Sequence, residues 1–292
     1  MLDQTLYTLR EISSWKELTA YEEHLPKPTG GKTKEWIYRG QRTHDEFDFA
    51  SGLERARQAF DIGFGELQDI ETKLVREFKR RLHHYTPDVP DAADDLEWLA
   101  LMQHYGAPTR LLDWTYSFYV AAYFAMEKAA NKGCEVWALN TGHFSARTAL
   151  SNEAFASIQS EVEHRKQSHS HEYADTAHML QDVIVERLRR QPMACVHPAN
   201  PFRLNERLTV QQGVFLFPGN ISMSFEENMC IREYRLQSPD DLIRFKIKAG
   251  AAVRKDILKK LYRMNISRAA LFPGLSGFAE SLKTRVGFLP EI

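Results

Sequence analysis

A short segment at residues 109–117 concentrates polar side chains that could bind an anion. Pro108 disfavours helical geometry in the residue before it, so we expect a helix to end there and a loop to follow. The next helix is predicted to start near Ser117, and the free N–H groups at a helix start attract anions. The side chains of this anion-binding cup would be Thr109, Arg110, Asp113, Thr115 and Ser117. Alternatively, Thr115 or Ser117 is only a helix N-cap, and Asp113 only pairs with an arginine.

A second polar group, Tyr38-Arg39-Gly40-Gln41, ends an aromatic and β-prone run at 35–40. We expect a strand that carries Arg39 to the edge or end of a sheet. There the planar guanidinium could bind a phosphate or a carboxylate through two donors, and Gly40 would let a ligand approach the backbone. The alternative is that Arg39 pairs with an acid at the edge of the core, such as Asp113.

A third group, Gln211-Gln212-Gly213, precedes the apolar run at 214–217. Two amides at the mouth of a buried strand can orient a substrate, but an amide cannot act as a general base near neutral pH. The alternative is a polar loop closed by a turn that tolerates Gly213.

Several common catalytic motifs are absent from the sequence. It contains no HExxH, no Walker A loop and no GxSxG, and the run around Ser276 lacks the spacing of a nucleophile elbow. The histidines of the polar segment near 164–178 have no carboxylates spaced to complete a metal site, so a solvated segment is expected and no metal. The absence of these motifs leaves open a chemistry in which the protein acts by binding and orienting its substrate.

Composition narrows the class of protein further. The chain has 292 residues, 43% hydrophobic and 26% charged, with a formal net charge of -1, so no overall attraction to nucleic acid or membrane is predicted. No apolar run approaches the roughly 18 residues of a membrane span, and the first residues do not resemble a secretory signal. Its three cysteines form no CxxC pair, which favours reduced thiols and a cytoplasmic location.

The elements that would position these groups follow from hydrophobic periodicity and from capping residues. We predict helices at 11–25, 66–85, 95–105, 117–133, through most of 142–190 and at 253–264, and strands at 35–40, 134–139, 193–196, 214–217 and 242–248. The last helix carries a basic side, which is interpreted as solvated, with a nucleic-acid patch as the alternative. No repeat or linker is evident, so one α+β domain is expected.

Several of these motifs together resemble the FRG domain, which is named for a (Phe/Tyr)-Arg-Gly motif. The resemblance rests on Trp36–Gln41, Gln103–Thr115, the AAYFA run at 121–125, Arg207–Phe215 and Ala270–Gly277. It implies a single FRG-type domain over residues 1–292, with core motifs at 36–283. Residues 1–30 would form a helical N-terminal extension, and 142–190 a helical insertion.

The same segments are similar to the three NAD-site motifs of ADP-ribosyltransferases. Tyr38-Arg39-Gly40 resembles the first motif, Asp113–Ala125 the second, and Gln211-Gln212-Gly213 the third in position. This implies a small mixed or antiparallel sheet, split as in those enzymes and flanked by helices. The sequence departs from the family at the position of the usual glutamate, where it has glutamines. Either another acid, such as Asp113, supplies the carboxylate, or the transferase activity is weak or lost.

The function implied by this resemblance is ADP-ribosyl transfer from NAD, or NAD cleavage. Arg39, Asp113 and Gln212 would be catalytic, while Tyr38, Gly40, Gln41, Thr109, Arg110, Thr115, Ser117 and Gln211 would bind NAD. Family analogy suggests a bacterial toxin or antiviral defence effector, with a protein or nucleic-acid acceptor and a regulatory or antitoxin partner. The alternative is a binding module without catalysis that recognises a nucleotide, a nucleic acid or a protein through the same cup.

Overall fold

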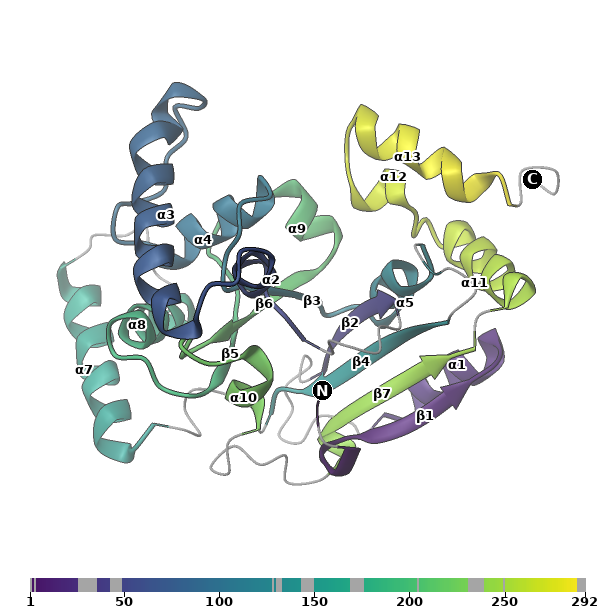
Figure 1. The fold of residues 1–292 in the computed structure, drawn as a ribbon, viewed down its shortest axis with the longest axis horizontal. Helices are drawn as coiled ribbons and strands as arrows, with labels where there is room; N and C mark the ends of the chain where they lie inside the picture. The colour runs from purple at the N-terminus through teal and green to yellow at the C-terminus, as the bar shows by residue number, and fades with distance from the viewer. Residues whose placement is uncertain are drawn as a thin grey trace.

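The fold is a mixed α+β arrangement built on one seven-stranded sheet, as the computed structural model shows (Figure 1). The structure describes residues 2, 4–25, 36–42, 49–127, 129, 133–142, 150–168, 176–203, 205–230, 239–248 and 250–287. Residues 27–34 are rich in turn-forming residues and are predicted to be a loop. They lie outside the described residues, as do His169 and His171 of the polar segment.

The sheet has the strand order β1-β7-β4-β2-β3-β6-β5. β1 pairs with β7 in parallel, and the other neighbouring strands pair antiparallel. The strands are β1 (Thr8–Ile12), β2 (Trp36–Arg42), β3 (Leu112–Thr115), β4 (Cys134–Asn140), β5 (Val196–Ala199), β6 (Gly213–Pro218) and β7 (Leu242–Ile247). The predicted fold class, α+β with a mixed sheet flanked by helices, is confirmed.

The sheet opens between β2 and β3. β2 pairs with β4 along the whole span Trp36–Arg42, but its register with β3 joins only Tyr38 to Thr115. The two strands therefore diverge after this single pair. The divergence separates a half formed by β1, β7, β4 and β2 from a half formed by β3, β6 and β5.

Helices surround both halves of the sheet (Figure 1). They are α1 (Trp15–Glu23), α2 (Gly52–Ala59), α3 (Leu67–Arg81), α4 (Asp95–His104), α5 (Phe118–Glu127), α7 (Asn152–Ser168), α8 (Thr176–Arg190), α9 (Glu206–Val210), α10 (Phe225–Met229), α11 (Ala251–Arg263), α12 (Arg268–Leu271) and α13 (Leu275–Arg285). Short 3-10 helices lie at Gln4–Leu6, Phe64–Glu66, Leu82–His84 and Pro239–Asp241. None of the described helices is long and apolar enough to span a membrane.

Side chains alternate between the two faces of the sheet, as the pleat of a strand requires. On β4, Val136 and Ala138 join the core under α1, α5 and α11, whereas Trp137 and Leu139 join the core on the opposite face, which includes Phe225 of α10. On β6 the alternating positions divide in the same way, and Phe215 and Phe217 pack with α3, α4, α7 and α8. The site described below therefore lies on a sheet covered on both sides.

The N-terminal extension differs from its prediction as a helical segment. α1 is present with Ser14 as its N-cap, but β1 precedes it and adds a parallel edge strand to β7. Within β1 only Ile12 is buried, while Leu9 is 48% exposed. Apolar alternation, the usual sign of a strand, is therefore too weak here to reveal it.

Two further segments differ from their predictions. The region at 43–65, for which no helix or strand was predicted, contains α2, whose capping box joins Ser51 and Glu54 in both directions. This S-x-x-E pattern is the sign in the sequence that could have found the helix. The strand expected at 193–196 begins only at Val196.

Gly40 of β2 lies against the backbone of α5. A Cβ added to it would lie 1.8 Å from Ala121 O and 2.7 Å from Ala125 N. Glycine is therefore needed for the close packing of strand on helix, and this packing is a structural reason for Gly40 besides the expected approach of a ligand. This contact holds the strand that carries Arg39.

We expect Gly40→Ala to destabilise the fold by about 3 kcal/mol, the upper part of the range for overpacked cores, because the clashing atoms belong to backbone. Urea unfolding followed by circular dichroism would measure the change. The matched control is Gly65→Ala, because nothing lies within 4 Å of a Cβ placed there. Equal stability of the two variants would contradict the packing role.

Candidate functional site

A cavity of about 480 Å³ lies where β2 and β3 diverge. Its walls come from both strands, from the end of α5, and from α9 and α12. The lining residues are Tyr38, Arg39, Gly40, Gln41, Arg42, Asp113, Trp114, Thr115, Phe124, Glu127, Arg207, Gln211, Arg268 and Phe272. The structure thus brings together members of all three predicted polar groups.

Arg39 crosses the gap between the two strands. Its Nη1 donates a hydrogen bond to the backbone carbonyl of Asp113, at 2.5 Å, rather than pairing with the carboxylate. Its Nε is buried and has no hydrogen-bond partner among the described residues. Burial lowers the pKa of Arg39 to about 10, which leaves the guanidinium charged at neutral pH. A buried donor without a partner on the wall of a cavity is suited to an incoming acceptor.

Three further arginines line the cavity and were not predicted: Arg42, Arg207 and Arg268. Arg268 is neutralised by Glu127, with Nη1 at 3.0 and 2.9 Å from the two carboxylate oxygens. Arg207 makes no such pair within the described part of the chain. Burial, and to a lesser extent the neighbouring Arg268, lower its pKa. Because only one of these four arginines has a close acid partner among the described residues, the cavity favours an anion.

One of these arginines, Arg207, could have been identified as a site residue from the sequence. Arg207 stands four residues before Gln211, so both side chains fall on one face of a helix. Phe272 lies in the Ala270–Gly277 motif that resembles the FRG domain, and Arg268 lies just before that motif. No local sequence pattern links either residue to the strands. Only the fold brings α12 over the cavity.

Phe272 forms an aromatic wall between two guanidinium groups and a second ring. The Cζ atoms of Arg207 and Arg268 lie 4.5 and 4.3 Å from its ring centroid, which is within cation–π range. Phe124 of α5 meets it edge to face at 6.0 Å. Cationic and aromatic groups therefore share one end of the cavity, a combination that suits a phosphate joined to a planar ring.

Asp113 provides a carboxylate that is not consumed by an ion pair. Its Oδ2 accepts a hydrogen bond from Gln103 Nε2 at 3.1 Å, and the side chain is exposed. Among the described residues it forms no close ion pair, in contrast to Glu127. Asp113 is therefore the acid of the cavity best placed to face positive charge on a ligand.

Thr115 and Gln211 line the cavity but also hold its walls together. Thr115 Oγ1 donates to Gln211 O at 2.7 Å and accepts from Ser117 N at 3.0 Å. Gln211 Nε2 donates to Leu271 O at 2.8 Å. These bonds connect β3, α9 and α12, so both residues have a structural task whether or not a ligand is bound.

Tyr38 and Gln41 contribute the floor from β2. Tyr38 packs edge to face on Phe118 at 5.3 Å, and burial raises the pKa of its phenol well above the ordinary value. The phenol stays protonated and cannot act as a base near neutral pH. Gln41 Nε2 donates to Glu135 Oε1 at 2.7 Å, which fixes the amide on the sheet.

Gln212 does not line the cavity, although it was predicted as a catalytic residue. Its backbone adopts φ 48° and its carbonyl accepts from Tyr116 N at 2.9 Å, which closes a turn. The side chain is exposed, and Gln211 faces the cavity instead. The turn between α9 and β6 determines which of the two adjacent glutamines faces the cavity. The spacing of residues in the sequence did not indicate which one it would be.

Ser117 and Thr109 also lie away from the cavity wall. Ser117 Oγ accepts from Val120 N at 3.3 Å, as an N-cap does. Thr109 is fully buried, donates to Gln103 Oε1 at 2.5 Å and accepts from Leu111 N at 3.2 Å. The expected loop at 109–117 contains the strand β3, because Leu112–Thr115 pairs with β6.

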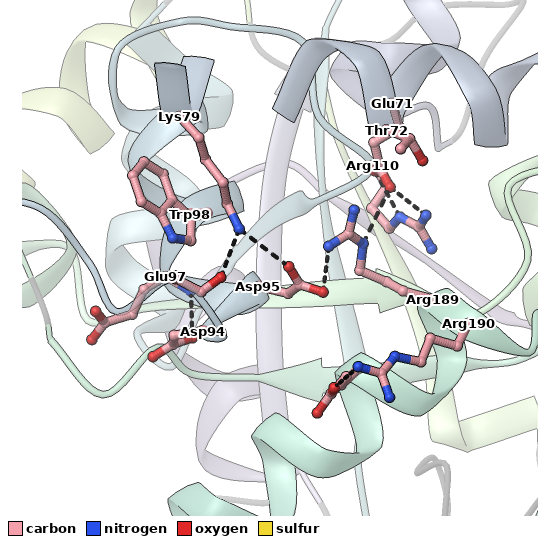
Figure 2. A network of polar contacts seen from close by, with 12 residues as sticks. Glu71, Thr72, Lys79, Asp94, Asp95, Glu97, Trp98, Arg110, Arg189 and Arg190 are labelled. Carbon is pink, nitrogen blue, oxygen red and sulfur yellow. Dashed lines mark hydrogen bonds and ion pairs between the residues drawn. The ribbon is translucent and has the colours of Figure 1, made fainter. Parts of the chain in front are cut away.

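Arg110 was predicted to bind NAD, and this is wrong because the side chain is fully buried beneath the sheet (Figure 2). Its Nε donates to Glu71 Oε1 at 2.7 Å, and Nη2 contacts the other carboxylate oxygen. The network continues through Arg189, which contacts Glu71 and pairs with Asp95. Arg110 therefore anchors the chain just before β3.

Residues 34–134 match the family model of the FRG domain. The match spans β2 and β3, the two strands that frame the cavity, and includes Arg39 and Asp113. No curated protein and no solved structure matches the chain. Among the described residues, no group of three or more His, Cys, Asp or Glu is arranged to hold a metal ion.

Proposed function

We propose that this member of the FRG domain family binds NAD in the cavity between β2 and β3 and cleaves its nicotinamide–ribose bond, in ADP-ribosyl transfer or NAD cleavage. The observation that carries the proposal is the meeting of Arg39, Asp113 and Arg207 in one cavity. Among the described residues, the two arginines have no close acid partner and Asp113 has no close basic one.

The cationic side of the cavity supports recognition of phosphates. The buried Nε of Arg39 has no partner, and Arg207 forms no ion pair among the described residues. Guanidinium groups bind phosphate oxygens through paired, charge-assisted hydrogen bonds. A volume of about 480 Å³ falls within the range of typical small-molecule sites. The aromatic wall at Phe272 would contact a planar ring of the same ligand.

Asp113 supports the catalytic part of the proposal. When the bond to nicotinamide breaks, positive charge develops on the ribose, and a fixed carboxylate beside that ribose stabilises it. The glutamate usual in ADP-ribosyltransferases is absent at Gln211 and Gln212. Asp113, on the neighbouring strand β3, would supply the carboxylate from another wall of the same cavity.

The test is NAD binding by calorimetry, followed by release of nicotinamide. We expect Arg39→Gln to weaken NAD binding by about 10- to 100-fold, because a hydrogen bond to a charged group contributes about 1.5–3 kcal/mol. The matched control is Arg80→Gln, since Arg80 lies 68% exposed on α3, away from the cavity. Thermal unfolding of both variants would show whether the fold is retained. Failure of the wild type to bind NAD at millimolar concentration would overturn the proposal.

A second function, a nucleotide-binding module without catalysis, is favoured by one observation. The other acid among the described residues that line the cavity, Glu127, is held by Arg268 and by Tyr123, whose hydroxyl donates at 3.1 Å. If Asp113 contributes nothing to bond cleavage, binding remains without turnover. NAD binding with no release of nicotinamide would support this reading.

The basic side of α11 gives little support to nucleic-acid binding. Arg254 donates to the carbonyls of Met126 and Glu127 at the end of α5, at 2.8 and 2.7 Å. Lys260 pairs with Asp256 at 2.8 Å on the same helix. Because these cations stabilise the fold, fewer remain for phosphate contacts. We therefore expect ligand binding at the cavity to depend weakly on salt.

A further inference from the structure

A second, smaller cavity adjoins the first on the far side of Asp113. Its volume is about 70 Å³, and its lining comes from α4, β3, α9 and β6. The residues are Ala100, Gln103, His104, Asp113, Asn205, Arg207, Leu208, Gln211 and Phe215. Asp113, Arg207 and Gln211 also line the large cavity, so the two spaces share a wall.

The small cavity is too narrow for a nucleotide but has room for water or for the tip of a side chain. Its polar groups converge from separate elements: His104 ends α4, Asn205 caps α9, and Gln103 reaches Asp113. The function proposed for the large cavity uses neither His104 nor Asn205. A half-buried imidazole beside the carboxylate of a ligand site is the group there best able to take up a proton near neutral pH.

We propose that the small cavity is the acceptor subsite, in which His104 takes the proton from a compact O–H or N–H nucleophile as it attacks the ribose. This inference rests on the NAD-cleaving function proposed above. The nucleophile has two sources with the same chemistry: solvent water, or the end of a side chain on an acceptor macromolecule. Asp113 lines both cavities, so its carboxylate lies at the boundary where the nucleophile would meet the ribose held in the large cavity.

The step is balanced without a further reactant. The nucleophile forms a bond to the ribose C1′, and the bond from C1′ to the nicotinamide nitrogen breaks. The electron pair of that bond leaves with nicotinamide, which becomes neutral. The proton of the nucleophile passes to a ring nitrogen of His104 and then to solvent.

The surroundings of His104 favour its neutral form. Burial and the positive charge of Arg207 on α9 lower its pKa, while Asp113 on β3 and the neighbouring Tyr105 are the other titratable groups close to it. A lowered pKa means that the imidazole is neutral at pH 7 and can accept a proton. As pH falls through that pKa, the ring is protonated and this capacity is lost.

The first experiment compares the pH profile of nicotinamide release in the wild type and in His104→Gln. We expect the wild type to lose activity on the acid side with one titrating group. The variant should lose about 100-fold in rate near pH 7, and this acid limb should disappear. NAD affinity, measured by calorimetry, should change less than threefold, because the large cavity is intact.

The second experiment follows the histidine ring protons by NMR, which needs no turnover. Adding ADP-ribose to the wild type should shift the signal that is missing in His104→Gln, and it should leave His83 and His84 unchanged. These two histidines are exposed at the end of α3 and provide matched controls. No shift of the His104 signal under saturating ADP-ribose would overturn the assignment of the small cavity as the acceptor subsite.

The outcomes separate the two proposals. If NAD does not bind the wild type, the proposed function fails. If NAD binds and is cleaved but His104→Gln keeps both the rate and the acid limb, only the acceptor subsite fails. If NAD binds without any release of nicotinamide, with or without a cell extract, the proton transfer is overturned and binding alone remains. Free ADP-ribose formed in buffer identifies water as the nucleophile, whereas label transferred only to extract macromolecules identifies a side chain.

Discussion

Asp113→Asn should reduce the rate of nicotinamide release by about 100- to 1,000-fold while leaving NAD bound. The reason is that the carboxylate interacts with positive charge that exists only as the glycosidic bond breaks, and removing one such preorganised group costs about this much. Asparagine keeps the size of the side chain and an oxygen that can accept from Gln103 Nε2. Binding in the ground state should be unchanged or slightly tighter, since a negative charge near the phosphates is removed.

The measurement is the steady-state rate of nicotinamide release, together with NAD affinity by calorimetry. Two controls separate Asp113 from acids in general. Asp69→Asn removes an exposed acid of α3, 68% exposed and paired with Lys73, and should have no effect on rate. Glu127→Gln should have a smaller effect than Asp113→Asn, because Glu127 already faces Arg268. The reverse order of these two effects would assign the carboxylate to Glu127 instead.

The candidate residues could be read from the sequence, but their convergence could not, because Arg39, Asp113 and Gln211 are far apart along the chain. The strand that carries Arg39 was predicted, whereas Asp113 was expected in a loop and lies on β3. Only the pairing of β2, β3 and β6 in one sheet brings these residues to a common gap. The structure provides a gap, between β2 and β3, where a sheet edge had been expected.

The sequence could not separate residues that bind a ligand from residues that bind the protein itself. Arg39 and Arg110 are both arginines at the ends of motifs, yet one lines the cavity and the other is fully buried against Glu71. Their roles depend on whether an acid from a distant helix reaches them. Glu71 is 39 residues from Arg110, and nothing local to β3 indicates the pairing.

Arg207 and Phe272 were missed for a related reason. Their side chains meet only because α9 and α12 pack beside one another, and Gln211 bridges to Leu271 across that contact. Neither helix is long enough to show a clear periodic pattern, and both depend on tertiary packing for their stability. Long-range packing of short elements therefore adds residues to a site of which the sequence indicated only some members.

The buried pair Arg110–Glu71 yields the largest expected change in stability. Both side chains are almost completely buried, at 0% and 1% exposed, and Phe217 lies beneath the guanidinium at 4.9 Å. Glu71→Gln leaves the charge of Arg110 buried with Arg189 nearby, so we expect a loss of about 3–5 kcal/mol in the free energy of unfolding. Urea unfolding would measure it. The matched control is Glu77→Gln on the same helix, whose pair with Arg81 is exposed and should contribute less than about 1 kcal/mol.

The same substitutions decide whether Arg110 has any part in ligand binding. The double variant Arg110→Met with Glu71→Leu replaces the pair by apolar groups and should recover much of the stability lost in Glu71→Gln, because no unpaired charge remains. If Arg110 only anchors the chain before β3, the folded double variant binds NAD as the wild type does. A stable double variant that has lost NAD affinity would instead return Arg110 to the site. If Arg110 only anchors the chain, loss of its ion pair lowers the stability of the fold and leaves NAD affinity unchanged. At Arg39 we expect the opposite, with NAD affinity lowered and stability retained.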